Sequence, residues 1–333
     1  MLILWFALAC GILAPIPAPP AIAQADSTST FTPTLTATIA ITATTIETST
    51  PTFTPTPTFS PPARRVLILS IDGLRPDAIY PAPMPNLIQL MQGGAFSLHA
   101  QTIHPSLTLP AHASMLTGMC PSKHGVDWND YLPGKGSALG TDIFDLAHAA
   151  GLKTVVVAGK RKLTQVTEPA SLDTVVVIDG DDLTLMDSLI ADFPQDFGVL
   201  FVHLPDTDTV GHEYGWLSRE QLGAIQRADE ALGQLLAALD ARGLRGETLI
   251  IVTSDHGGFK TSHGTNSTDD MTIPWIASGP GILPTSLTTL IHTMDTAATA
   301  AFALGLPIPA EWDGVPVYEA FGLPFIAQSE ECE

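Results

Sequence analysis

The chain has 333 residues, of which 45% are apolar and 14% charged, and its formal net charge at pH 7 is −20. Only 14 Lys and Arg residues stand against 34 Asp and Glu residues, which argues against a module for nucleic-acid polymers, because such modules carry basic patches. A small phosphorylated substrate held by metal ions is still allowed. The cysteines Cys10, Cys120 and Cys332 lie far apart, which argues against a disulfide-dense scaffold and against a cysteine-ligated zinc finger.

The N-terminus reads as an export leader. Residues 1–14 are almost purely apolar, and about 14 residues is shorter than the roughly 20 that a membrane span needs. Ala21-Ile22-Ala23 and Ala23-Gln24-Ala25 both fit a small-residue cleavage site, so we predict a signal peptide over residues 1–25 and an exported protein. No Lys or Arg precedes the apolar run. A lipid anchor at Cys10 is a weaker alternative, since Ala7 stands where such a motif usually has Leu.

Residues 26–62 are mostly Thr, Ser and Pro. Such a segment buries too little apolar surface to offset the entropy of ordering it. We predict a disordered stalk over 26–62, followed by one folded domain over 63–328. A tether to a membrane or cell wall stays open, and so does the oligomeric state.

The folded part alternates apolar, β-branched runs with helical patterns. The expected strands are 66–71, 154–158, 175–178, 199–204 and 249–253. The expected helices are 141–150, 218–242 and 295–304, and a glycine follows each of them closely. Continuous apolar strands are typical of a parallel sheet buried on both faces. We therefore predict an α/β fold, doubly wound, with a mostly parallel central sheet flanked by helices.

Acidic and imidazole side chains follow three of these strands. Ligands of an open parallel sheet bind at the carboxyl ends of its strands, so these side chains are expected to meet at one edge. Carboxylate and imidazole without thiolate suit zinc or another first-row divalent ion. The residues in question are Asp72, then Asp206, Asp208 and His212, then Asp255, His256 and His263.

Thr108 is the candidate nucleophile. It precedes Pro110, which suits the first turn of a helix, and the pattern predicts a helix ending near Gly118. A helix N-terminus favours an anionic phosphoryl group. A Thr hydroxyl is inert at neutral pH unless a base or a metal lowers its pKa.

Several motifs occur in order: Asp72-Gly73-Leu74-Arg75-Pro76-Asp77, Thr108-Leu109-Pro110-Ala111-His112, His124-Gly125-Val126, Asp208-x-x-Gly211-His212, Ser254-Asp255-His256-Gly257 and His263-Gly264. Together they resemble the alkaline-phosphatase superfamily, and within it the type I phosphodiesterase/nucleotide pyrophosphatase branch. The resemblance covers roughly residues 64–281.

The resemblance implies two zinc ions, with other divalent ions as an alternative. One ion would be held by Asp208, His212 and His263, with Asp206 as an alternative ligand to Asp208. The other would be held by the residues Asp72, Asp255, His256 and Thr108. The resemblance also gives Thr108 the role of a nucleophile that forms a phospho-threonine intermediate, and Asn129 the role of a donor to a phosphoryl oxygen.

The implied activity is hydrolysis of phosphate esters, with phosphodiesters or nucleotide pyrophosphates favoured. Lys160-Arg161-Lys162-Leu163 is similar to a segment of phosphonoacetate hydrolases, in which lysines meet the substrate, so Lys160 and Lys162 are candidate substrate contacts. A phosphomonoesterase, a phosphonate hydrolase and, remotely, a non-catalytic surface binding module are the alternatives. His112 is expected to support the nucleophile, and a Cys120–Cys332 disulfide is left open.

Overall fold

The computed structural model describes residues 61–324, 326 and 328–332. The predicted leader and nearly all of the predicted stalk therefore lie outside the described residues. The strands are β1 (Arg65–Ile71), β2 (Ala95–Gln101), β3 (Lys153–Ala158), β4 (Thr174–Val177), β5 (Phe197–Leu204), β6 (Thr248–Thr253), β7 (Thr272–Ser278) and β8 (Thr285–Ser286). The α-helices are α1 (Pro85–Gly93), α2 (Thr108–Thr117), α3 (Pro121–His124), α4 (Ile143–Ala149), α5 (Asp182–Ala191), α6 (Asp206–Tyr214), α7 (Arg219–Ala241), α8 (Thr268–Met271) and α9 (Asp295–Leu304).

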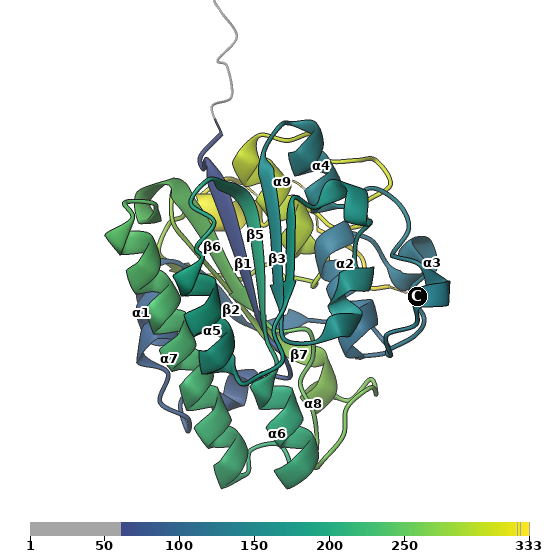
Figure 1. The fold of residues 1–333 in the computed structure, drawn as a ribbon, viewed down its shortest axis with the longest axis vertical. Helices are drawn as coiled ribbons and strands as arrows, with labels where there is room; N and C mark the ends of the chain where they lie inside the picture. The colour runs from purple at the N-terminus through teal and green to yellow at the C-terminus, as the bar shows by residue number, and fades with distance from the viewer. Residues whose placement is uncertain (1–60, 325, 327, 333) are drawn as a thin grey trace, which may run out of the picture. The chain divides into compact units, whose positions relative to one another are not determined.

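The strands form one sheet in the order β4-β3-β5-β1-β6-β7-β2-β8 (Figure 1). The five strands from β4 to β6 run parallel, as the apolar runs predicted. β7 pairs antiparallel with both β6 and β2, and neither β2 nor β7 was predicted. The prediction of a mostly parallel α/β sheet flanked by helices is confirmed.

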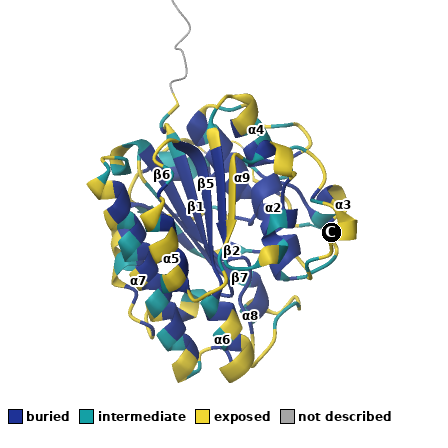
Figure 2. Cartoon of the chain, in the orientation of Figure 1, coloured by how far each residue is buried: buried dark blue, intermediate teal, exposed yellow. Residues whose placement is uncertain are grey.

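Side chains of the central strands alternate between two apolar layers. In β1, Val66 and Ile68 join a core that also contains residues of α2, α4 and α9, whereas Leu67 and Leu69 join a core with α1, α5 and α7. Period-two alternation into two buried layers is what a sheet covered on both faces requires. Figure 2 shows the central strands buried between the two helical layers.

The prediction that every strand is buried on both faces was wrong for the 175–178 run. The strand there is β4, one residue earlier than predicted, and all four of its residues are exposed. β4 pairs with β3 on one side only, because it is the edge strand of the sheet. Its valines reflect β propensity rather than two-sided burial.

The predicted helices are present, with ends within two residues of those expected. Ser218 caps α7 by accepting a hydrogen bond from the Gln221 N–H, but the Gln221 side chain accepts from Leu217 N–H instead of completing a capping box. Asp142 and Asp145 form the capping box, at the start of α4. In the part of the chain that the structure describes, no helix is both long and apolar enough to cross a membrane.

The α2–α3 connection is held by a buried histidine. The His124 Nδ1 accepts from Val126 N–H at 3.1 Å, so its Nε2–H donates to Ser114 Oγ at 2.9 Å. Burial lowers the pKa of His124 to about 4, which keeps the ring neutral at pH 7. Nearby, Cys120 forms a disulfide with Cys332, which ties the last residues of the chain to the start of α3.

Candidate active site

Four neighbouring strands of the sheet each deliver charged side chains to one edge. β1 leads to Asp72, β5 leads through Pro205 into α6 with Asp208, and β6 leads to Asp255. β3, which lies beside β5, leads to Lys160. The convergence expected from strand ends is therefore observed, and a lysine joins it.

The predicted ligand residues form two groups, and the ligand atoms within each group lie within 4.8 Å of one another. We call Asp208, His212 and His263 the first ligand group, and Asp72, Asp255 and His256 the second ligand group. Asp206, the alternative ligand, instead accepts a hydrogen bond from Asp182 N–H at the start of α5 and lies in neither group.

Neighbouring ligand atoms are about one tetrahedral edge apart. In the first ligand group, Asp208 Oδ1 lies 3.4 Å from His212 Nε2 and 3.5 Å from His263 Nε2. In the second ligand group, His256 Nε2 lies 3.3 Å from Asp72 Oδ1 and 3.3 Å from Asp255 Oδ2. The His256 and His263 rings stack at 3.6 Å between centroids, so the two groups adjoin.

One oxygen of each ligand carboxylate is buried without a hydrogen-bond partner among the described residues. These atoms are Asp72 Oδ1, Asp208 Oδ1 and Asp255 Oδ2, the ones that face the histidines. The other oxygen of each carboxylate is hydrogen-bonded, for example Asp255 Oδ1 to the Gly73 and His256 amides. Buried carboxylate oxygens left without donors need a cation to offset their desolvation.

The histidines of both ligand groups turn Nε2 toward the carboxylates. His212, His256 and His263 each place Nδ1 2.8–2.9 Å from a backbone carbonyl, of Thr261, Gly257 and Ser106 respectively. A carbonyl oxygen only accepts, so Nδ1 carries the proton and the Nε2 lone pair faces the carboxylates. Burial lowers the pKa of His256, and lowers that of His263 to about 4, which keeps both rings neutral.

Thr108 is the first residue of α2, as predicted, and is buried. Its Oγ1 lies 3.3 Å from His256 Nε2, which places the hydroxyl at the second ligand group. His112 supports it from one turn later, because Nδ1–H donates to the Thr108 carbonyl at 2.8 Å while Nε2 accepts from Ser70 Oγ–H.

The first turn of α2 has fewer free amides than a helix N-terminus normally offers. The Leu109 N–H donates to Asn129 Oδ1 at 2.9 Å, Pro110 has no N–H, and the Ala111 N–H donates to Leu107 O. The Thr108 N–H is the amide of this turn left without a partner among the described residues. This helix N-terminus therefore offers one free backbone amide, that of Thr108, to an anionic group.

Asn129 and Lys162 lie together beside this helix terminus. Lys162 Nζ donates to Asn129 Oδ1 at 3.0 Å, and burial lowers the pKa of Lys162. Both Asn129 contacts use its carbonyl oxygen, so its Nδ2 amine remains free to donate. The Leu109 amide therefore holds Asn129 next to Thr108.

Lys160 bridges the two ligand groups, because it contacts one carboxylate of each. Its Nζ contacts Asp72 Oδ2 at 2.7 Å and Asp208 Oδ2 at 2.5 Å. His203 is buried in β5 and donates to the same Asp72 oxygen at 2.9 Å. Burial alone would raise the pKa of Asp72, but Lys160 and His203 outweigh burial and hold that pKa well below its usual range.

Trp216 forms an apolar wall at the first ligand group. Its ring meets His212 and His263 edge-on, at 5.3 and 5.9 Å between centroids, and its Nε1–H donates to Gly73 O. A Cβ on Gly258 would lie 2.2 Å from Trp216, so only glycine allows this approach. Sequence reasoning missed Trp216, because a tryptophan after a helix gives no signal for a ligand site.

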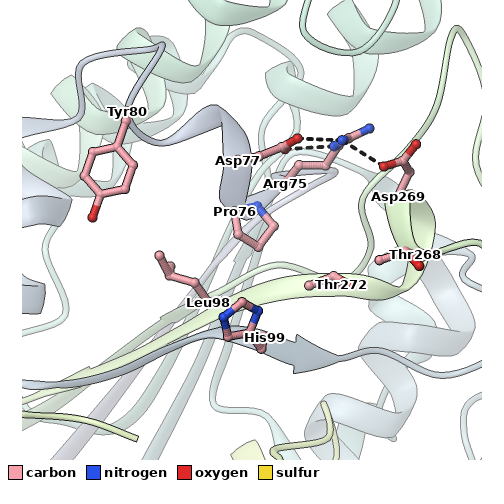
Figure 3. A pocket seen from close by; sticks show the side chains of 9 residues that line it. All are labelled: Arg75, Pro76, Asp77, Tyr80, Leu98, His99, Thr268, Asp269 and Thr272. Atoms are coloured by element: carbon pink, nitrogen blue, oxygen red, sulfur yellow. Dashed lines mark hydrogen bonds and ion pairs between the residues drawn. The ribbon is translucent and has the colours of Figure 1, made fainter.

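Arg75 of the first motif is already neutralised. Its Nη2 lies 2.6 Å from Asp77 and 2.9 Å from Asp269, and its Nη1 donates to Gly258 O. Figure 3 shows this guanidinium between the two carboxylates, at a cavity of about 370 Å³ lined also by Tyr80. Arg75 therefore anchors the loop after β6.

The chain is similar in sequence to known proteins. The family model for type I phosphodiesterase / nucleotide pyrophosphatase matches residues 66–302. A pyrophosphatase/phosphodiesterase of Schizosaccharomyces pombe is 28% identical over 222 residues, which cover 59% of this chain and 45% of that protein. Ectonucleotide pyrophosphatase/phosphodiesterase family member 3 of Rattus norvegicus is 28% identical over 223 residues, which cover 59% of this chain and 25% of that protein. The match thus spans less than half the length of either relative.

Solved structures share the fold. An inactive variant of murine ectonucleotide pyrophosphatase/phosphodiesterase 5 in complex with AMP superposes with a TM-score of 0.65 at 17% identity, and the match covers 77% of this chain and 98% of that one. The alkaline phosphatase PafA superposes with a TM-score of 0.67 at 14% identity, covering 80% of this chain and all of that one. At these identities the likeness establishes the fold alone.

Proposed function

Because the chain belongs to the type I phosphodiesterase/nucleotide pyrophosphatase family, we propose that it is an exported two-metal hydrolase of phosphate esters, with phosphodiesters or nucleotide pyrophosphates as the favoured substrates. The carrying observation is the pair of ligand groups beside the Thr108 hydroxyl at the head of α2. The family match covers most of the described residues and supports the same chemistry.

Zinc is the proposed metal in both ligand groups. Ligand atoms about 2.0–2.1 Å from a tetrahedral zinc ion lie about 3.3–3.4 Å from one another, by simple geometry. The separations within the two groups are 3.1–3.5 Å and lie close to this edge. Three partnerless carboxylate oxygens and three Nε2 lone pairs supply the ligand atoms, and Thr108 Oγ1 completes the second group. Other divalent ions remain the alternative.

Bound divalent ions would lower the pKa of the Thr108 hydroxyl and offset charge on the phosphoryl oxygens. The Thr108 oxygen attacks phosphorus, a P–O bond forms to Thr108, and the P–O bond to the leaving group breaks. Water then forms a new P–O bond, and the phospho-threonine bond breaks to return the hydroxyl. Asn129 Nδ2 and the Thr108 N–H donate to phosphoryl oxygens as negative charge develops.

Thr108 gives the sharpest test of this proposal. The purified protein should contain two equivalents of zinc and hydrolyse bis-p-nitrophenyl phosphate, and EDTA should remove both the metal and the activity. T108A should keep the zinc but lose turnover, whereas T108S should keep both. Acid quenching during turnover should give a peptide containing phospho-Thr108 in mass spectrometry. An active, metal-free preparation would refute the proposal.

Lys162 favours a second candidate substrate class. Its ammonium at Asn129 adds positive charge beside the Thr108 helix terminus, which suits a substrate with an additional negative charge. A phosphomonoester or a phosphonate carrying a carboxylate has such a charge. Comparing turnover of bis-p-nitrophenyl phosphate, p-nitrophenyl phosphate and phosphonoacetate, in wild type and K162M, decides between the classes.

Export has a structural argument of its own. Disulfides persist mainly in oxidising compartments, and Cys120 is joined to Cys332. We therefore propose that residues 1–25 direct secretion, periplasmic entry or cell-surface display, and that residues 26–62 separate the folded domain of residues 63–328 from any tether. Mass spectrometry of the mature N-terminus and of the non-reduced Cys120–Cys332 peptide tests both statements.

A further inference from the structure

We propose that Lys160 is a positioning residue that serves as the shared internal counter-ion of both ligand groups, and that it holds their carboxylates together when metal is absent. The inference rests on the proposed function only in treating the two groups as cation sites. It differs from the expectation drawn from the sequence, which made Lys160 a substrate contact.

The Lys160 ammonium contacts one oxygen of each of two carboxylates and leaves the other oxygen free. Lys160 Nζ bonds Asp72 Oδ2 and Asp208 Oδ2, whereas the Oδ1 atoms of the same residues face the histidines and lack hydrogen-bond donors. The ammonium therefore sits on the outer side of both carboxylates. Lys160 orients Asp72 and Asp208 while leaving the inner oxygen of each available to a cation.

Burial makes this charge necessary. The side chains of Asp72, Asp208 and Asp255 are 0%, 5% and 0% exposed, so without metal three acidic groups share a site with little water. Of the lysines and arginines in the described part of the chain, Lys160 forms the ion pairs with Asp72 and Asp208. The Lys160 side chain is itself only 20% exposed. Buried acidic groups at such close range repel one another, and a buried ammonium between two of them offsets that repulsion.

The backbone fixes Lys160 in this position. The preceding residue, Gly159, follows β3 and packs so closely on Pro205 that a Cβ there would lie 2.4 Å from the proline ring. Pro205 in turn precedes α6, which carries Asp208. The Gly159 N–H also donates to the carbonyl of His203, whose ring holds Asp72. The segments that carry the lysine and its two acids are thus joined at one point of the sheet edge.

Charge balance predicts how the stabilising effect of Lys160 changes when metal binds. Bound metal neutralises the carboxylates, so the contribution of Lys160 to stability should be large in the metal-free protein and small in the zinc-loaded protein. By linkage, removing the ammonium should tighten zinc binding to the folded chain. If Lys160 only contacted substrate, its substitution would change KM but would alter the stability of the metal-free and the zinc-loaded protein equally.

The test compares melting temperatures of wild type, K160M, K160R and K153M at pH 8, each with saturating zinc and with EDTA. Lys153 is the matched control, since it pairs with Asp173 at the surface, far along β3 from the ligand groups. Metal-free K160M should melt on the order of 10 °C below metal-free wild type, from the loss of a buried ion pair. Zinc-saturated K160M should melt within a few degrees of zinc-saturated wild type.

K160R keeps the charge and should melt near wild type in both states, and K153M should shift both states equally. A zinc titration at low temperature should show at least tenfold tighter binding to K160M. Equal losses in both states, weaker zinc binding, or a K160R variant as unstable as K160M would each overturn the inference. A wild-type melting temperature that does not respond to zinc would instead refute the proposed metal sites.

Discussion

Asn129 allows the proposed chemistry to be tested one hydrogen bond at a time. Its Oδ1 is occupied by the Leu109 N–H and by Lys162, which fixes the amide plane and leaves Nδ2 as the free donor. Removing one preorganised donor to a developing oxyanion costs about 3 kcal/mol, which is about a hundredfold in kcat. N129A should therefore turn over bis-p-nitrophenyl phosphate about a hundredfold more slowly while its zinc content stays at the wild-type level.

The matched variant is N129D. A carboxylate keeps the acceptor for Leu109 N–H and the contact with Lys162, but it replaces the Nδ2 donor with a negative oxygen. N129D should therefore be slower than N129A, although it resembles the native residue more closely in shape. Steady-state kcat and KM, with zinc measured by mass spectrometry on the same samples, decide the matter. Near-normal turnover of N129A, or N129D faster than N129A, would contradict the assigned role.

Three further predictions concern stability and the apolar wall formed by Trp216. The pKa of His124 is about 4 in the folded protein, below the unfolded value of about 6.5. Its contribution of about 3 kcal/mol to the free energy of unfolding is therefore present above pH 6.5 and lost as the pH falls toward 4. H124N should flatten this part of a urea-unfolding pH series, and an unchanged slope would refute the assignment. The double variant C120S/C332S should lose up to about 5 kcal/mol, since the disulfide closes a sequence separation of 212, and should keep wild-type turnover; lost activity at full stability would instead tie the bridge to the site. G258A should cost about 2 kcal/mol by crowding Trp216 and should lower zinc affinity, and wild-type near-ultraviolet circular dichroism would show that the wall is not crowded.

The parallel half of the fold and the meeting of the acidic side chains at one edge could be predicted because they depend on local rules. The division of the ligands into two groups came from the resemblance to a known family. A buried parallel strand reads as an unbroken apolar run, and the next few residues must lie at the ligand-binding edge. This rule predicts that Asp72, Asp208 and Asp255 lie at the same edge, whatever the order of the strands. The preference for Asp208 over Asp206 came from family spacing, and the geometry of α6 agrees with it.

The features that were missed depend on non-local pairing. The run that forms β7 contains Pro274, and β2 mixes polar with apolar residues, so neither reads as a central strand. The two contacts of Lys160 require β3 to lie beside β5, which no local pattern states. The Cys120–Cys332 bridge depends on the path of the last residues of the chain, which spacing does not encode.

The backbone carbonyl that holds His212 determines which sequence changes this site can tolerate during evolution. Any residue at the Thr261 position offers the same carbonyl to His212, and Thr261 is exposed. Substitutions there should accumulate freely without turning the imidazole. Sequence variation at this position would therefore give no hint that its carbonyl orients His212, and mutational scans that read only side chains would overlook it.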